Sequence, residues 1–322
     1  MPKIKPLNNS YVFNIKEEDM SKLIKMTLIG LVLVSTSVFA NSTTTRLLLR
    51  EVQYSADTPV RISAIETLKD FLSDSEVERS LLNVLQNVGE DRNVRIAAVK
   101  ALSSEASEKK VYDVIVRAHD QSNDTVFRAT CLQSLYKAAP RNNSIERGLI
   151  SNLLNAPSVE IRRASAFGLM ASTSDRTVSD ALTNVAMNPR NDVRQRIEAI
   201  KSLYAKSTDS RLRTNIQAIA ENGADNLNVR VAAVRFMTTF PQGTRARNVL
   251  ERLIELGGNS SVRSMAAQAI RFNLRENDVR WFHLPVDPRG NINRDPFDGA
   301  ESFSFLKVDS SLENGGGINF SK

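Results

Sequence analysis

Arginine recurs along this chain at almost constant intervals, and a regular row of guanidinium groups could bind a polyanion such as nucleic acid. Successive members of the row are 33 or 34 residues apart. This arginine column consists of Arg61, Arg95, Arg128, Arg162, Arg196, Arg230 and Arg263. The alternative is a structural role, in which each arginine packs its aliphatic stem between repeats and hydrogen-bonds a neighbouring carbonyl or carboxylate.

Other residues that carry chemistry are few. A single cysteine, Cys131, excludes an internal disulfide and a cysteine-rich metal site. The two histidines, His119 and His283, lie far apart and lack the spacing of metal ligands. The sequence contains no Ser-His-Asp spacing, no glycine-rich phosphate loop and no paired carboxylates in a cleft-like context. It therefore predicts a non-catalytic protein without metal or cofactor.

The overall charge is mildly basic. The net charge of +7 results from 43 basic and 36 acidic residues in a chain of 322. Proteins that bind nucleic acid usually concentrate positive charge on one face, so bulk charge does not single out nucleic acid as the partner.

The arginine column lies in a repeated segment of twelve residues, of which DRNVRIAAVKAL at residues 91–102 is one copy. Each copy begins with a residue type that caps helix N-termini. The capping residues are Asp57, Asp91, Asp124, Ser158, Asp192, Asn226 and Asn259. Three residues after each arginine comes a small residue, namely Ala64, Ala98, Cys131, Ser165, Ala199, Ala233 or Ala266. Each copy ends in a large apolar residue, namely Leu68, Leu102, Leu135, Leu169, Leu203, Met237 or Ile270. These spacings place the three columns on one face of a helix.

A second amphipathic segment lies between successive copies. Examples are residues 76–89, 144–154, 176–187 and 244–258. Each has apolar residues at helical spacing and ends in a short polar or glycine-containing turn. Two helices in each period of 33 or 34 residues, without strand patterns, predict an all-α solenoid of about seven helix pairs over residues 41–276.

The order of cap, Val-Arg, small residue and Leu in the second helix resembles bacterial HEAT repeats, particularly the short variety associated with bilin lyases. The resemblance covers about residues 43–275. It implies a solenoid whose second helices line the concave side and whose arginines have a structural role. The motif says nothing about the ligand.

If second helices line a groove, the residues that face it are those turned away from the layer between repeats. The sequence predicts an elongated groove with a weakly basic centre and interleaved aromatic side chains. The groove candidates are Lys100, Gln133, Tyr136, Phe167, Lys201, Tyr204 and Arg235. An ordinary solvated helix face is the competing interpretation.

The N-terminus has the layout of an export signal. Lys22 and Lys25 precede an uncharged, mainly apolar run, and Ala40 provides a small residue for cleavage. The apolar run is too short for a typical membrane span, so we expect no stable span after cleavage. We predict a signal peptide at residues 20–40 and a periplasmic or secreted protein. Residues 1–19 fit poorly before such a signal, and we interpret Met20 as the better start.

The C-terminal segment, residues 277–322, loses the helical pattern. Proline, glycine and small polar residues predict irregular or disordered structure. Its aromatic residues near Trp281 either cover the last repeat or belong to a motif that docks on a partner.

Three functions fit these features. The leading one is an exported, non-catalytic scaffold that binds another protein through the groove of second helices. The second is binding of an anionic polymer or nucleic acid through the weakly basic groove. The third, by analogy with relatives that carry such repeats, is a lyase-like enzyme.

Overall fold

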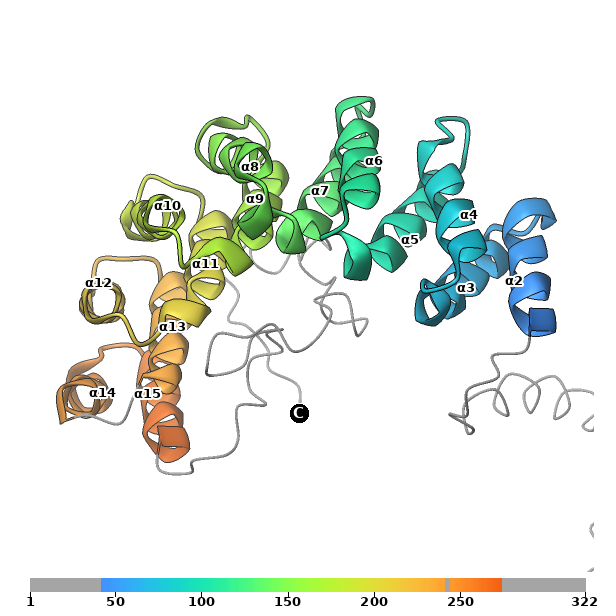
Figure 1. Cartoon of the computed structure of the whole chain (residues 1–322). Coiled ribbons are helices and arrows are strands. Elements are labelled where there is room, and N and C mark those ends of the chain that lie inside the picture. Colours follow the sequence, from blue (N-terminus) through green and yellow to red (C-terminus); the bar gives the residue numbers. More distant parts are fainter. Residues whose placement is uncertain (1–41, 241–243, 274–322) are drawn as a thin grey trace, which may run out of the picture. The chain divides into compact units, whose positions relative to one another are not determined.

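A computed structural model of the chain describes residues 42–240 and 244–273 (Figure 1). The chain divides into two compact units, Met1–Thr45 and Arg46–Lys322, and everything described below belongs to the second unit apart from the first turn of helix α2. The expected N-terminal extension (residues 1–19), the signal peptide (20–40) and the C-terminal segment (277–322) lie outside the described residues.

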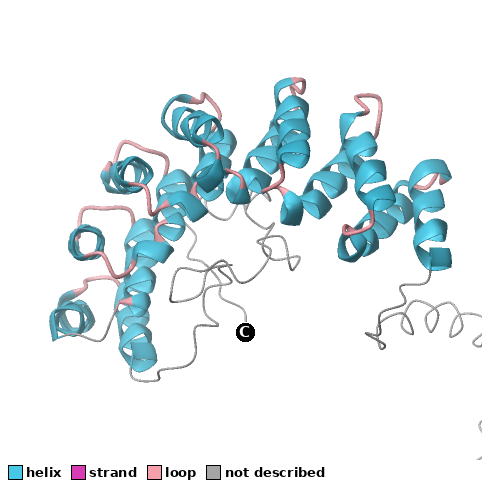
Figure 2. Ribbon diagram, in the orientation of Figure 1, coloured by secondary structure: helices cyan, strands magenta, loops and turns pink. Residues whose placement is uncertain are grey.

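The described residues form helices and connecting turns without a strand (Figure 2). The first helices of the pairs are α2 (Ser42–Tyr54), α4 (Ser75–Gln86), α6 (Lys109–Asp120), α8 (Asn143–Asn155), α10 (Arg176–Met187), α12 (Ser210–Glu221) and α14 (Thr244–Leu256). The second helices are α3 (Thr58–Leu68), α5 (Arg92–Leu102), α7 (Thr125–Ser134), α9 (Val159–Gly168), α11 (Val193–Ser202), α13 (Leu227–Phe236) and α15 (Ser260–Asn273). The structure thus confirms the α-solenoid and its seven helix pairs.

The capping column begins the second helices as the sequence predicts, with one exception. Asp91, for example, accepts hydrogen bonds from the backbone N–H groups of Asn93 and Val94. Asp57 also lies directly before its helix but accepts no such bond with its side chain. Pro59 follows it in the first turn and lacks an N–H group, so one of the two usual donors is missing.

The small and large apolar columns form the core between repeats. Every small-column residue is buried, and so is every large-column residue except Ile270, which is half-buried. Ile270 lies in α15, the last helix that the structure describes. Small side chains let neighbouring second helices approach closely, and the large ones fill the layer that remains.

Second helices pack directly on one another, whereas successive first helices touch less (Figure 1). Helices α7 and α9 come close together at Gly168, which faces the backbone of α7. A Cβ atom at Gly168 would lie 2.6 Å from the carbonyl oxygen of Leu132. The chain therefore uses glycine here to bring two second helices together.

A 3₁₀ turn extends each of the first six second helices, which the sequence pattern does not predict. These turns are η2 (Lys69–Phe71), η3 (Ser103–Glu105), η4 (Leu135–Lys137), η6 (Met170–Ser172), η7 (Tyr204–Lys206) and η8 (Met237–Thr239). A 3₁₀ turn has three residues per turn instead of 3.6, so side chains in it leave the face that the helical pattern assigns to them.

Candidate functional site

The arginine column binds backbone carbonyls at the ends of the first helices. The Nε–H donates to a carbonyl oxygen in the last turn of the preceding first helix, where helical carbonyls have no partner within the helix. The pairs are Arg61 with Val52 (2.9 Å), Arg95 with Leu85 (3.2 Å), Arg196 with Ala186 (2.9 Å) and Arg230 with Ala220 (3.1 Å). Each of these arginines thus joins the two helices of its own pair.

Two members of the column also bind a carboxylate of the next repeat. Arg61 forms a two-point ion pair with Glu90. Arg196 donates to both carboxylate oxygens of Asp225, each at 2.6 Å, and both side chains are buried. Hydrogen bonding to Arg196 holds the pKa of Asp225 below its usual range, and burial opposes this shift. These pairs join consecutive repeats.

The remaining members of the column differ from one another. The Arg95 guanidinium lies over the ring of Phe127, 4.2 Å from its centroid. Arg162 donates to the side chain of Gln195 at 2.9 Å, and also to backbone carbonyls. Arg128 is half-buried, and Arg263 is exposed. At most positions, therefore, the guanidinium is committed to contacts within the chain, as the structural interpretation expects.

Four of the groove candidates are buried, contrary to the expectation that they face an open groove. They are Gln133, Tyr136, Phe167 and Tyr204. Tyr136 lies in η4 and Tyr204 in η7, so the 3₁₀ geometry moves both away from the predicted helical face. Tyr136 meets Phe167 edge to face at 6.3 Å between ring centroids. The aromatic residues therefore pack between repeats, and partner binding by them stays a prediction.

The three basic candidates, Lys100, Lys201 and Arg235, are half-buried. Burial lowers the pKa of all three, and Glu66 opposes the shift at Lys100. At Lys201, Glu198 opposes the shift, whereas the positive charges of Arg163 and Arg235 add to it. The sequence prediction of a basic centre at Lys201 and Arg235 thus corresponds to two side chains that interact electrostatically.

A third basic residue, Arg163, also interacts with Lys201, and the sequence prediction does not include it. It directly follows Arg162 of the arginine column, in α9. Equivalent positions of the neighbouring repeats hold Ala129 and Ile197, so a charge in an apolar column was the signal that could have identified it. Arg163, Lys201 and Arg235 come from three successive second helices, and we refer to them as the cationic cluster.

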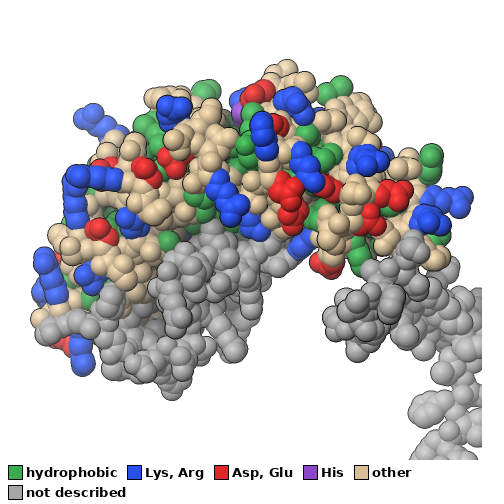
Figure 3. Space-filling view, in the orientation of Figure 1, with side chains coloured by type: hydrophobic (Ala, Val, Ile, Leu, Met, Phe, Trp, Pro, Cys, Tyr) green, Lys and Arg blue, Asp and Glu red, His purple; other side chains and the backbone are tan. Residues whose placement is uncertain are grey.

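Two described acidic residues, Glu198 and Glu160, lie near the cationic cluster. Glu198 is buried and lies one turn before Lys201 in α11. Glu160 lies one turn before Arg163 in α9, and hydrogen bonds from its own backbone and from Ser158, with the charges of Arg194 and Arg163, lower its pKa against the effect of burial. Elsewhere, basic and acidic side chains are interspersed over the face seen in Figure 3.

The residues with nucleophilic or acid–base chemistry lie apart from the cationic cluster. Cys131 is fully buried in α7, and burial raises the pKa of its thiol. His119 is buried at the end of α6, and burial lowers its pKa although its Nδ1 lies 2.8 Å from the Asp120 carboxylate. Within the described ranges, no three His, Cys, Asp or Glu side chains group as metal ligands would.

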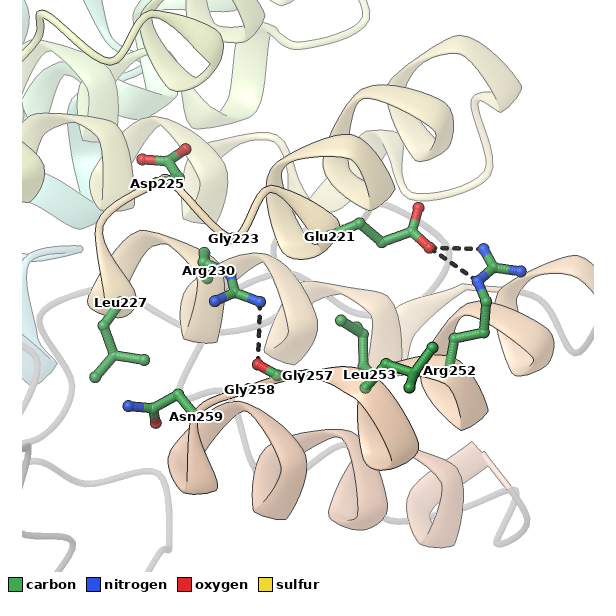
Figure 4. Close-up of a pocket in the computed structure, with 11 residues that line it drawn as sticks. Glu221, Gly223, Asp225, Leu227, Arg230, Arg252, Leu253, Gly257, Gly258 and Asn259 are labelled. Atoms are coloured by element: carbon green, nitrogen blue, oxygen red, sulfur yellow. Dashed lines mark hydrogen bonds and ion pairs between the residues drawn. The ribbon is translucent and has the colours of Figure 1, made fainter.

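The described helices include none with both the length and the apolar character needed to cross a membrane. Among the cavities of the described surface, two lie between neighbouring repeats. One, of about 610 Å³, lies between α10 and α12 and is lined by residues that include Asp180, Arg211 and Asn215. The other, of about 500 Å³, lies between the last two helix pairs (Figure 4).

Comparison with known proteins gives one sequence match. Residues 45–136 match the family model described as HEAT repeats. No curated protein sequence matches the chain. Among solved structures, human deoxyhypusine hydroxylase in complex with glycerol is 14% identical, with 80% of this chain and 99% of that one covered and a TM-score of 0.35. YibA of E. coli is 13% identical, with 83% and 100% covered and a TM-score of 0.34. These two structural likenesses are too weak to carry an argument about activity.

Proposed function

We propose that this chain, in which residues 45–136 match HEAT repeats, is a non-catalytic scaffold that binds another protein through the face formed by its second helices. The observation that carries the proposal is the cationic cluster. In three successive repeats the charge of Lys201 interacts with those of Arg163 and Arg235, and burial already removes part of the hydration of Lys201 and Arg235.

Like charges that are close together attract anionic groups. Glu198 balances part of the charge. A partner segment with acidic side chains would be attracted to the same cluster, and flanking apolar residues could contact the half-buried surface between repeats. We therefore propose an acidic segment of another protein as the ligand of this face.

Binding of an anionic polymer remains the second candidate, because the same cluster is basic. A long polyanion would need a row of cations, and the arginine column does not provide one. Its members Arg61, Arg95 and Arg196 are engaged with carbonyls, carboxylates or an aromatic ring of the chain itself. A protein ligand with a local acidic segment fits three clustered cations better.

We also propose that the protein acts in the periplasm or after secretion. The support is the charged, apolar and small-residue order of residues 20–40. N-terminal sequencing of protein recovered outside the cytoplasm checks this proposal. We expect Asn41 as the first residue, and a protein that keeps residues 20–40 would contradict cleavage after Ala40.

The binding test uses residues 41–322 as bait and compares two double variants. Lys201→Gln with Arg235→Gln removes two charges of the cationic cluster. The matched control, Arg79→Gln with Arg245→Gln, removes two exposed arginines from the first helices α4 and α14. Circular dichroism verifies that both variants keep the fold of the parent.

We expect the cluster variant to bind the partner protein at least about tenfold more weakly than the parent does. The reason is that hydrogen bonds to charged groups contribute about 1.5–3 kcal/mol each. The control should bind like the parent. Equal binding by all three proteins would contradict the proposed site.

Salt dependence then separates the two ligand classes. A polyanion held by six or more cations would lose about a thousandfold in affinity between 50 and 200 mM salt. A protein segment held by the three cations of the cluster should lose far less. A loss of the larger size would favour the polyanion.

A further inference from the structure

Two repeats contain a carboxylate at one fixed place, directly before the N-cap of a second helix. Glu90 precedes Asp91, and Asp225 precedes Asn226. Each carboxylate accepts hydrogen bonds from two partners. It pairs with an arginine of the column and accepts the backbone N–H of the capping residue, at 2.8 Å for Glu90 and 2.7 Å for Asp225. The structure itself thus shows which ligand this arginine position binds.

Arg230 has no such carboxylate. The residue before the next N-cap, Asn259, is Gly258, which has no side chain. The uncharged carbonyl oxygen of Gly257 partly replaces the missing carboxylate. It accepts the Asn259 N–H at 2.7 Å and lies 3.4 Å from Nη2 of Arg230. The side chain of Arg230 is nevertheless buried, with 7% of the residue exposed.

The aromatic contact that Arg95 makes is also missing at Arg230. Phe127, the ring under Arg95, is the third residue after the N-cap Asp124. The third residue after the N-cap Asn259 is Val262. Arg230 thus receives neither a carboxylate nor a ring from the next repeat.

The Arg230 side chain lines the cavity of about 500 Å³ between the last two helix pairs (Figure 4). Two acidic residues also line it, but each is already paired. Glu221 accepts from Arg252 at 2.6 Å, and the two face each other in Figure 4. Asp225 is held by Arg196, and its carboxylate also interacts electrostatically with Arg230 without a hydrogen bond between them. Among the charged residues that line this cavity, Arg230 is the one without a carboxylate of its own at hydrogen-bonding distance.

The backbone beside Arg230 leaves room for a ligand. A Cβ atom at Gly258 would meet nothing within 4 Å, and the φ angle of +68° is one that glycine adopts readily. Helix α15 begins directly after Asn259, and the N-terminal end of a helix favours a negative charge.

We propose that this cavity binds a carboxylate group from another molecule, which takes at Arg230 the role that Glu90 and Asp225 have in their own repeats. A guanidinium matches a carboxylate through two parallel hydrogen bonds. A monoanion fits better than a phosphate dianion, because Glu221 and Asp225 also line the cavity. The site is independent of the cationic cluster and of the function proposed for it.

The test adds the missing carboxylate to the chain. Gly258→Asp places an acid before the N-cap, as in the repeats with Glu90 and Asp225. Gly258→Asn is the matched control, because Asn and Asp both tolerate a positive φ and differ here in charge. Arg245→Gln removes an exposed cation of α14 that does not line the cavity, so we expect no loss of binding.

Acetate is the probe, observed by saturation-transfer NMR on residues 41–322, with acetamide and inorganic phosphate as comparison probes. We expect saturable binding of acetate and none of acetamide. Gly258→Asp should weaken acetate binding about tenfold or more, because its own carboxylate occupies Arg230. Gly258→Asn should bind acetate more tightly than Gly258→Asp, and Arg245→Gln should bind it like the parent.

Absence of saturable acetate binding would overturn the proposal. So would equal binding by Gly258→Asp and Gly258→Asn, or tighter binding of phosphate than of acetate. Competition identifies the source of the carboxylate. Displacement by a blocked Gly-Asp-Gly peptide indicates an acidic side chain, and displacement by Gly-Gly-Gly with a free carboxyl end indicates a C-terminus. Displacement by neither peptide assigns the site to a free small carboxylate.

Discussion

Asp225→Asn tests how much the ion pair between repeats contributes to stability. The side chains of Arg196 and Asp225 are 1% and 5% exposed, and both carboxylate oxygens accept at 2.6 Å. The substitution keeps the shape of the side chain but leaves the Arg196 charge without its counter-ion. Removing one partner of a buried pair typically costs about 3–5 kcal/mol. Because Asp225 also borders a cavity, we expect the lower end, about 3 kcal/mol.

Urea denaturation followed by circular dichroism at 222 nm measures this cost. Because solenoids can unfold in parts, hydrogen exchange of α11 and α13 serves as a local measurement. Glu221→Gln is the matched control. Its pair with Arg252 has the same 2.6 Å distance but is exposed to solvent, so it should cost at most about 1 kcal/mol. Equal costs for the two variants, or a cost of Asp225→Asn below about 1 kcal/mol, would refute the reasoning.

The same pair predicts a dependence on pH. Arg196 holds the pKa of Asp225 below its usual range, so the folded state favours the ionised carboxylate. The stability that results is fully present above the unfolded pKa of about 3.9 and is lost as the pH falls through the lower folded value. The difference between parent and Asp225→Asn should therefore stay constant from pH 7 to about 5 and shrink only below about 4. A difference that shrinks between pH 7 and 5 would contradict this assignment.

Three further predictions concern helix packing, the buried thiol and a helix cap. Gly168→Ala should destabilise the chain by about 1–3 kcal/mol, because the added Cβ would lie 2.6 Å from the Leu132 carbonyl oxygen. The control is Gly148→Ala, in an open part of α8, which should stabilise the chain by about 0.5–1 kcal/mol. Thermal melts compare the two variants. The Cys131 thiol should react with a disulfide reagent at pH 8 only after denaturant is added, since burial both shields it and raises its pKa, and rapid labelling of the folded chain would contradict this. Asp91→Ala should cost about 1 kcal/mol in urea denaturation through loss of the helix cap, and an unchanged midpoint would contradict the capping role.

Much of the fold could be predicted because the repeat determines it locally. The side chain of Asp91 caps the helix that follows it, as the sequence pattern indicates. Ala98 and Leu102 are buried where their spacing places them. Caps and helical spacing act within one or two turns, so they can be recognised in a single sequence.

The face of second helices was predicted less well. The helical pattern turned Tyr136 and Tyr204 toward an open groove, but both are buried in 3₁₀ turns that no sequence signal announced. Arg163 lies directly beside the arginine column and is not part of its pattern, so the pattern did not indicate it. The position of Lys201 near two other cations depends on how three repeats stack.

The sequence by itself determined the period of the repeat, the order of cap, arginine and core residues, and therefore the solenoid. Only the tertiary structure decided what each arginine binds. Arg196 meets a carboxylate, Arg95 meets a ring, and Arg230 faces a cavity beside a glycine turn. The physical reason is that the arginine side chain reaches into the following repeat, where its partner depends on a turn about 30 residues further along the chain.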